Sequence, residues 1–384
     1  MRLAFVSLLA ACSFPHGTVR DGDAQMGESD GPMRDGPAPE QFAKRKPITI
    51  DRALVGKTGA PPTLAGYPML YSVTDPALAL RPTGDVFDAE GDDIVFADAG
   101  GATLAHEIEL YDPLTGRLVA WVNVPLLNTI TATTNTTIYI YYGDDQLTTS
   151  TQQPALVWDD AFEAVWHMNE NPTLAPPQIK DRTSHGRSGT AMGTAAADGL
   201  VAGALAFDGV DDAVRIGTWT QLTNASFTLE VWVRPETTQL GQEVALGFHK
   251  SNANQQSIHM RVYDDGGVRF SFWGQDLGRP AGAIAYGQWN HFVGTYNNAN
   301  DASRLYLAGV QAATGNQGPF TAVDGAGSIG AWDGCSPCDQ FFKGLIDEVR
   351  VSSVERTVHW ISTTHANIND PGAFAMTGPA EDVP

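Results

Sequence analysis

Short runs of β-branched and aromatic residues, separated by turn residues, recur along most of this chain. Between residues 46 and 153, examples are LVAWV (118–122) and TIYIYY (137–142). Asp-Pro, Gly-Gly and Gly-Asp pairs, which favour turns, lie between the runs. Regularly spaced short strands of this kind are typical of a β-sandwich, and no convincing helical pattern interrupts them. The sequence therefore predicts an all-β fold, with a first β-sandwich module over residues 46–153.

A second set of strand-like runs extends over residues 154–368. The run FTLEVWVR (227–234) alternates, so its Phe, Leu and two Val residues would share one sheet face and its Thr, Glu, Trp and Arg the other. The tryptophan on the second face, Trp232, indicates that this face is partly covered or curved. The turn DDGG (264–267) between two runs is a hairpin signal. We therefore predict a second β-sandwich over 154–368, followed by a C-terminal tail at 369–384.

Four segments of the second module occur in the order found in a known family. They are FDGVDDAV (207–214), FTLEVWVRP (227–235), WNHFVGTY (289–296) and FKGLIDEVRV (342–351). These segments resemble the laminin-G-like, concanavalin A-type jelly-roll lectin domain of bacterial surface proteins. The resemblance implies a jelly roll over roughly 160–365 and a role in binding.

The first module resembles a bacterial domain of unknown function that often precedes this lectin-like domain. The matching segments are GDDIVF (91–96), HEIE (106–109), LVAWV (118–122) and IYIYYG (138–143). This resemblance implies the order of the two domains but no activity.

The first residues resemble an export signal. A basic residue precedes a short apolar stretch, and LAAC (9–12) resembles a bacterial lipobox. The resemblance implies a signal peptide at 1–11, lipid attachment to Cys12 and a location at the cell outer membrane or cell surface. The alternative is a buried N-terminal strand with an incidental cysteine. Residues 12–45 carry too few apolar side chains to offset ordering entropy, so we expect a disordered tether.

The charge of the chain narrows the range of its partners. With a formal net charge of -21 it would be repelled by phosphate backbones, so we expect no nucleic-acid binding. After the N-terminal segment, no apolar run approaches the roughly 18 residues that a membrane-spanning helix needs, so membrane attachment would be through lipid alone. The expected partner is a glycan or a cell-surface protein.

Catalytic motifs are incomplete in this sequence. A jelly-roll glucanase would carry two or three carboxylates at alternating positions of one strand. The nearest case is Glu107 and Glu109, which would share a face but lie in the first module and lack a third acid at the needed spacing. We therefore predict no catalytic residues. The alternative is a glycoside hydrolase whose carboxylates are not recognised from the sequence.

A calcium site is expected in the second module, because folds of the resembled superfamily often hold a structural ion bound by six to eight oxygens. Asp347 lies inside a strand-like run, where an unpaired carboxylate would be costly if buried. We take Asn169, Glu170 and Asp181 as its partners. The alternative is a carboxylate hydrogen-bonded to backbone or arginine. The acidic turn at 208–212 is a second candidate, for which a solvated connection is the simpler explanation.

Aromatic rings near loops are candidates for stacking on sugar rings. The alternative for each is a place in the core, where most tryptophans of a β-sandwich lie. The candidate ligand-binding residues are Trp219, Trp273, Tyr286 and Trp332.

The pair Cys335 and Cys338 lies between predicted strands. In an exported protein we expect a structural disulfide that closes a small loop, worth about 2 kcal/mol, and not a thioredoxin-like redox site. The sequence as a whole predicts a lipid-anchored, non-catalytic binding or adhesion protein for carbohydrate, with calcium-dependent binding. Besides the glycoside hydrolase, a further alternative is a structural envelope or protein-interaction component without a small ligand.

Overall fold

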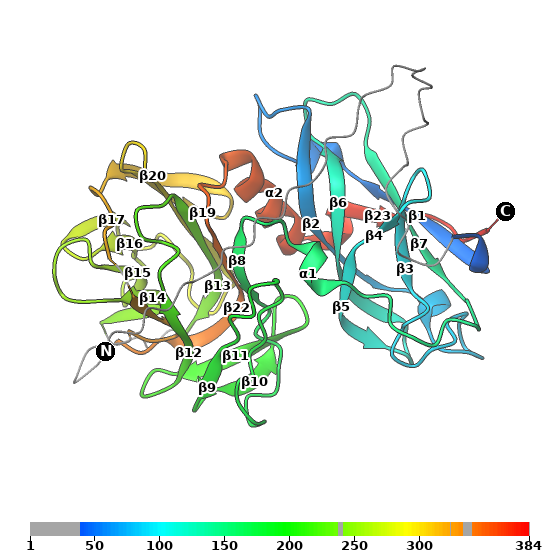
Figure 1. Ribbon diagram of the computed structural model, residues 1–384, viewed down its shortest axis with the longest axis horizontal. Coiled ribbons are helices and arrows are strands. Elements are labelled where there is room, and N and C mark those ends of the chain that lie inside the picture. The colour runs from blue at the N-terminus through cyan, green and yellow to red at the C-terminus, as the bar shows by residue number, and fades with distance from the viewer. Residues whose placement is uncertain (1–38, 237–240, 323, 333–339, 384) are drawn as a thin grey trace, which may run out of the picture. The chain divides into compact units, whose positions relative to one another are not determined.

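The computed structural model describes residues 39–383, except 237–240, 323 and 333–339. Antiparallel strands dominate these residues, which confirms the all-β prediction (Figure 1). Cys12, Cys335 and Cys338 lie outside the described residues, so the predicted lipidation and disulfide stay predictions. None of the described helices has the length and apolarity needed to cross a membrane.

The first β-sandwich consists of a three-stranded sheet in the order β2-β6-β5 and a six-stranded sheet in the order β23-β1-β7-β3-β4, with β24 also paired to β1. Its strands from the N-terminal part of the chain are β1 (Lys44–Ile50), β2 (Thr63–Thr74), β3 (Val95–Asp98), β4 (Thr103–Leu104), β5 (His106–Asp112), β6 (Arg117–Asn128) and β7 (Thr136–Tyr142). Short helices connect them: η1 (Pro39–Gln41), η2 (Arg52–Leu54) and η3 (Pro76–Leu78).

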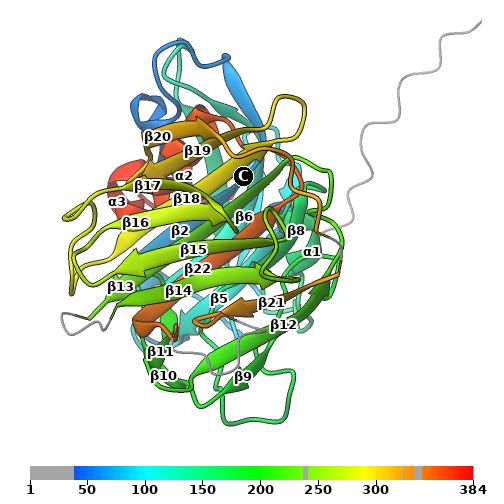
Figure 2. The same ribbon diagram turned by 90° about the vertical axis from the view of Figure 1, so that its left-hand side faces the viewer.

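The second module is the predicted jelly roll, with two sheets enclosing one core. An eight-stranded sheet has the order β10-β11-β22-β13-β18-β19-β20, with β8 paired to β22, and a seven-stranded sheet has the order β17-β16-β15-β14-β21-β12-β9. The seven-stranded sheet faces the viewer in Figure 2.

The strands of the eight-stranded sheet are β8 (Phe162–Trp166), β10 (Ala195–Asp198), β11 (Gly203–Asp208), β13 (Phe227–Pro235), β18 (Asn290–Asn297), β19 (Ala302–Leu307), β20 (Val310–Asn316) and β22 (Lys343–Ser352). Those of the seven-stranded sheet are β9 (Thr190–Met192), β12 (Ala213–Trp219), β14 (Gln242–His249), β15 (Ser257–Tyr263), β16 (Val268–Phe272), β17 (Gln275–Arg279) and β21 (Gly325–Ile329). A short helix, α1 (Pro154–Val157), precedes β8.

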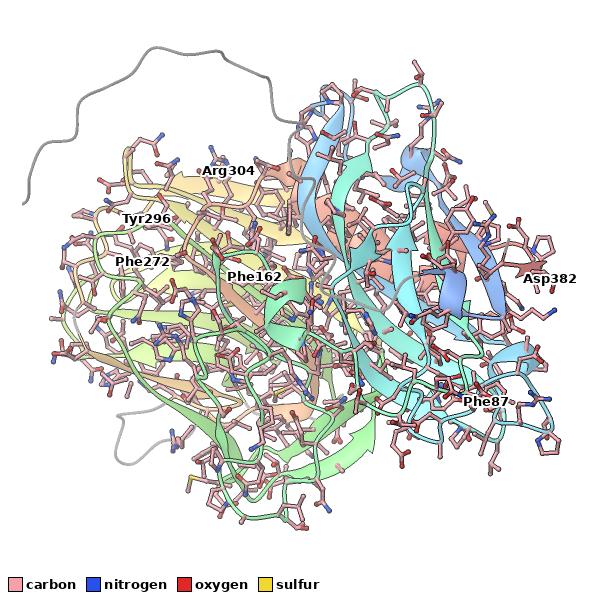
Figure 3. The ribbon with its side chains drawn as sticks, turned by 45° about the vertical axis from the view of Figure 1, so that its right-hand side comes forward. Phe87, Phe162, Phe272, Tyr296, Arg304 and Asp382 are labelled. Atoms are coloured by element: carbon pink, nitrogen blue, oxygen red, sulfur yellow. The ribbon has the colours of Figure 1, made fainter. Side chains whose placement is uncertain are left out.

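Both faces of β13 are buried, as Trp232 indicated. Phe227, Leu229, Val231 and Val233 lie in the jelly-roll core. Trp232 belongs instead to the core of the first sandwich, so the outer face of the eight-stranded sheet is covered by the first module around this residue. Side chains of this packed region are drawn in Figure 3, where Phe162 is labelled among them.

The C-terminal residues differ from the predicted tail. Helices α2 (Val358–Asn369) and α3 (Pro371–Phe374) lead into β23 (Ala375–Thr377) and β24 (Glu381–Asp382), both of which pair with β1. These strands complete the first sandwich, because the edge of β1 offers unpaired backbone groups that a returning strand can satisfy. Asn367 of α2 also bonds both the amide and the carbonyl of Leu70 in β2, each at 2.8 Å.

Candidate functional site

The outer face of the seven-stranded sheet carries polar side chains. Alternation along β15 places Ile258, Met260 and Val262 in the core, so His259 and Arg261 project from the opposite face. This period-2 pattern is visible in the sequence of β15.

The strand register brings further polar side chains onto the same face. His259 is paired with Ser271 of β16, and Arg261 is paired with Arg269. Ser271 is in turn paired with Asp276 of β17. Residues directly opposite each other in neighbouring strands point to the same side of a sheet, so these five side chains form one polar patch.

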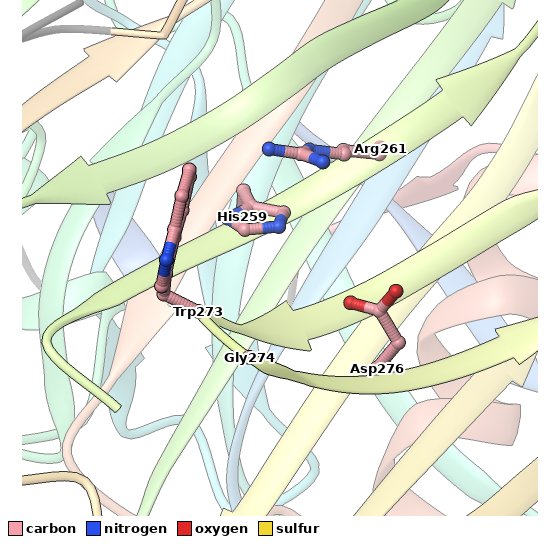
Figure 4. Close-up of a pocket in the computed structure, with 5 residues that line it drawn as sticks. All are labelled: His259, Arg261, Trp273, Gly274 and Asp276. Atoms are coloured by element: carbon pink, nitrogen blue, oxygen red, sulfur yellow. The ribbon is translucent and has the colours of Figure 1, made fainter. Parts of the chain in front are cut away.

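A cleft of about 430 Å³ opens on this patch, as Figure 4 shows. It is lined by His259, Arg261, Trp273, Gly274 and Asp276. It therefore combines one large aromatic ring with a cation, an anion and an imidazole, so it offers a ligand both an apolar face and hydrogen-bonding groups.

Trp273 is held at the cleft by the turn between β16 and β17. The backbone N–H of Trp273 donates to the backbone carbonyl of Ser257 at 2.9 Å. Gly274 follows with φ +81°, and a Cβ at this position would lie 2.5 Å from Oδ1 of Asn254. A glycine is therefore required for this turn, which leaves the indole of Trp273 half-buried at the cleft wall.

Trp332 supports the cleft from behind. Its ring stacks on Trp273 with centroids 6.1 Å apart and planes 20° from parallel, and it contacts His259 edge-on at 4.8 Å. A Cβ at Gly247 would lie 3.2 Å from Cε3 of Trp332, so the glycine leaves room for the indole against the sheet. With 3% of its surface exposed, Trp332 orients Trp273 and does not itself form the open wall.

His259 is neutral in this environment. Burial lowers the pKa of His259 well below its ordinary value, and the positive charges of Arg261 and Arg269 lower this pKa further. Only 2% of its surface is exposed, and its Nδ1 has no hydrogen-bond partner among the described residues.

The charges around His259 are unevenly compensated. Arg269 pairs with Asp276 at 2.6 Å, on a largely exposed part of the sheet. Arg261 donates from Nη1 to the uncharged amide of Gln242 at 2.6 Å and forms no ion pair with any described residue. Of the described residues that line the cleft, Asp276 alone carries a carboxylate, whereas glycoside hydrolysis uses a pair of acids.

The predicted sugar-binding aromatics divide into two groups. Trp273 lines the cleft and Trp332 supports it, as described above. Trp219 lies in the jelly-roll core with its Nε1 donating to the carbonyl of Ile216, which matches the alternative stated for it. The hydroxyl of Tyr286 donates to the carbonyl of Tyr263 and accepts from the amide of Gly266, so it holds a hairpin turn.

Two of the predicted calcium ligands serve local structure. Asp181 accepts hydrogen bonds from backbone amides, including that of Arg187 at 2.7 Å. Glu170 accepts from the amide of Lys180 and from Arg182. These contacts are the ones stated as the alternative, and among the described residues Glu170, Asp181 and Asp347 do not form one group of converging carboxylates.

The other two predicted ligands lie at the contact between the modules. Asn169 donates to Oε1 of Glu109 at 3.0 Å. Asp347 is fully buried, and its Oδ2 accepts from the amides of Leu200 and Val201. Burial raises the pKa of Asp347 well above its usual value, and the nearby carboxylates of Glu348 and Glu109 raise it further.

A buried polar cluster joins the two modules around His167. Its Nδ1 lies 2.6 Å from Glu348 of β22, and its Nε2 lies 3.0 Å from Glu107 of β5. Glu109 lies 3.7 Å from Nδ1. Because both ring nitrogens face carboxylates, both must donate, and His167 is an imidazolium. Burial alone would lower the pKa of His167, but these three carboxylates together raise it well above its ordinary value.

Tryptophans and an arginine complete this interface cluster. Trp121 donates to Glu109 at 2.8 Å and stacks on His167 with planes 11° apart. Arg350 pairs with Glu348 at 2.7 Å and lies over the ring of Trp121. Glu107 and Glu109 both lie in β5 and both face His167. Their side chains are buried between the sheets and hydrogen-bonded, so they are not accessible to a substrate in this structure. This enclosure supports a structural role for the pair.

Comparisons with known families agree with the two modules. Residues 208–362 match the concanavalin A-like lectin/glucanases superfamily, in its laminin-G-like model. The second module is a concanavalin A-like jelly roll. Residues 90–169 match a domain of unknown function, DUF2341, which here precedes the lectin-like module. No curated protein matches the chain.

Several solved structures share the β-sandwich fold. Domain 4 of an extracellular arabinanase from Geobacillus stearothermophilus, solved with arabinotriose, is 21% identical, with 53% of this chain and 98% of that chain covered and a TM-score of 0.38. The carbohydrate-binding module of a Ruminococcus gnavus sialidase, bound to α2,3 sialyllactose, is 15% identical, with 37% and 83% covered and a TM-score of 0.33. The binding domain of botulinum neurotoxin serotype D is 12% identical, with 54% and 51% covered and a TM-score of 0.41, so the match spans about half of that chain.

Proposed function

We propose that this protein is a non-catalytic carbohydrate-binding protein, and that glycan binds in the cleft beside Trp273. The observation that carries this proposal is the half-buried indole of Trp273, fixed by a glycine turn and by Trp332, next to Arg261 and Asp276. An indole face provides apolar area for the C–H face of a sugar ring. The neighbouring charged groups can donate to and accept from its hydroxyls.

The test is a glycan array with the full chain and two variants. Trp273→Ala should abolish binding, whereas Trp273→Phe should retain part of it because an aromatic face remains. Phe87→Ala, which removes an exposed ring from the first module, is the matched control and should bind like the wild type. An array without signal, or a signal indifferent to Trp273→Ala, would rule out the cleft as a glycan site and favour a protein-binding or structural role.

Calcium dependence and surface attachment are separate proposals. Repeating the array with a chelator tests the first, and loss of signal on chelation is the expected result. The support for lipid attachment is the lipobox-like segment ending at Cys12. Cys12→Ala should release the protein from the membrane fraction into the soluble one, and continued membrane retention would contradict the anchor.

A further inference from the structure

We propose that the glycan bound in this cleft is acidic, with its anionic group directed at Arg261 and His259. This inference rests on the proposed function and specifies the class of sugar. It follows from three features of the cleft: an uncompensated cation, an unpartnered buried imidazole nitrogen, and the contrast between these groups and the charge of the whole chain.

The first feature is the pairing of two arginines. Arg261 and Arg269 are directly opposite each other in neighbouring strands, an arrangement that is unfavourable for like charges. Asp276 compensates Arg269. Arg261 has Gln242 as its hydrogen-bond partner and the ring of Trp332 within 5.8 Å, and neither carries a negative charge. The carboxylate of Asp276 also acts on Arg261, so among the described residues the two arginines share one negative charge, and one positive charge is left for a ligand.

The second feature is the imidazole of His259. It lies two residues before Arg261 on the same sheet face and lines the same cleft. Its buried Nδ1 has no partner in the described part of the chain, although buried polar atoms are nearly always hydrogen-bonded in proteins. In the tautomer that carries the proton on Nδ1, this nitrogen would donate to one oxygen of an anionic group while Arg261 donates to it as well. Hydrogen bonds from arginine to an anionic oxygen are stronger than those to a neutral hydroxyl.

The third feature is the charge of the chain. Its formal net charge is -21, so its general surface repels anions. Arg261, Arg269 and Asp276 together leave one positive charge on this sheet face, which favours an acidic ligand there while the rest of the chain repels anions. The sugar's anionic group is a carboxylate, as in uronic acids, or a sulfate ester, and both present oxygens to a guanidinium in the same way.

The experiment uses pairs of oligosaccharides that differ only in the acidic group. Titration calorimetry with the full chain compares oligogalacturonate with its methyl ester, and a sulfated galactan oligosaccharide with its desulfated form. We expect the acidic member of one pair to bind at least about tenfold more tightly, because a charged hydrogen bond is lost in the neutral member. The pair that shows the preference identifies the carboxylate or the sulfate as the anion.

Variants test whether Arg261 is the residue that binds the anionic group. Arg261→Gln should remove the preference for the acidic sugar, so that the two members of a pair bind with affinities within about twofold of each other, and Arg261→Lys should restore part of the preference. Arg117→Gln makes the same charge change at an exposed position of the first module and should leave the preference intact. Melting temperatures of all variants show whether each is folded.

The outcomes separate the inference from the proposed function. Equal binding of both members of each pair, with sensitivity to Trp273→Ala, overturns the acidic ligand and leaves the carbohydrate site in place. An acidic preference that survives Arg261→Gln overturns the inference too, because the anion then binds elsewhere. Absence of binding by every oligosaccharide, acidic or neutral, contradicts both.

Discussion

Two buried histidines of this protein have opposite electrostatic environments. His167 lies between the modules with three carboxylates around it, which hold its pKa well above the ordinary value. His259 lies beneath the cleft, where burial and then two arginines hold its pKa well below that value. Both nitrogens of His167 have partners, whereas Nδ1 of His259 has none among the described residues. The paired imidazole stabilises the fold, and the unpaired one is the group that we propose faces a ligand.

The largest expected effect comes from replacing His167 by Leu. This change leaves Glu107, Glu109 and Glu348 buried without their shared cation. Breaking a buried ion pair from one side costs about 3–5 kcal/mol, so the free energy of unfolding should fall by that order. Urea unfolding monitored by tryptophan fluorescence measures it. A loss below about 1 kcal/mol would show that the cluster does not join the modules.

The pH dependence of stability should show the positive charge of His167. Since the folded-state pKa of His167 is raised, its contribution is complete below about pH 6.5 and is lost as pH rises through the folded pKa. The pKa of Glu348 is lowered overall, because His167 and Arg350 outweigh the effect of burial, so its contribution is present above its usual pKa and lost in acid. Burial raises the pKa of Glu109 to about 7. The protonated carboxyl of Glu109 therefore favours the folded state in acid, and this contribution is lost as pH rises from the usual pKa of glutamate towards 7.

The measurement is the difference in unfolding free energy between the wild type and His167→Gln across pH 5 to 9. We expect this difference to be largest at the acidic end and to shrink as pH rises above about 6.5. A difference that grows with pH would contradict the imidazolium assignment.

A smaller effect is expected for Gly274→Ala in the cleft. The residue has φ +81°, and its new Cβ would meet Asn254, so we expect a loss of stability of about 1 kcal/mol. Because the turn positions Trp273, the loss of binding free energy for the glycan should exceed the loss of unfolding free energy. Gly186→Ala is the control: this residue has φ +67° but open space around a Cβ, so the change measures the cost of backbone strain without a steric contact.

The smallest stability change is expected for His259→Leu. This variant removes a buried polar atom that has no partner, so the free energy of unfolding should stay within about 1 kcal/mol of the wild type. Binding of the acidic sugar should nevertheless weaken. If His259→Leu were as destabilising as His167→Leu, the contrast between the two sites would be lost.

Alternation along single strands made part of this molecule predictable. The pattern of 227–234 predicted that its Phe, Leu and two Val residues share one face and that the face of Trp232 is partly covered or curved; the first group lies together in the jelly-roll core, and Trp232 is covered. The same reasoning applied to 257–263 would have placed His259 and Arg261 on one open face. They were not among the predicted ligand-binding residues, all of which were aromatic residues near loops.

The roles of individual aromatic and acidic residues were not predictable in this way. Trp219 and Trp273 both lie near strand ends, yet one is enclosed by Trp166 and Phe248 and the other borders a cleft. Asp181 and Asp347 both suited an ion, yet the first caps backbone amides and the second lies beside the interface cluster. Which neighbours a side chain meets depends on how sheets pack, and local pattern does not contain that information.

The sequence by itself determined the all-β class, the order of the two modules, and the alternating faces of 227–234, because these depend on local spacing and propensity. The tertiary structure alone decided that the C-terminal strands complete the first sandwich and that His167 bridges Glu107 and Glu348. It also decided that Trp332 supports Trp273. These contacts join residues far apart in the chain, and they form only once the sheets have packed and water has been excluded from between them.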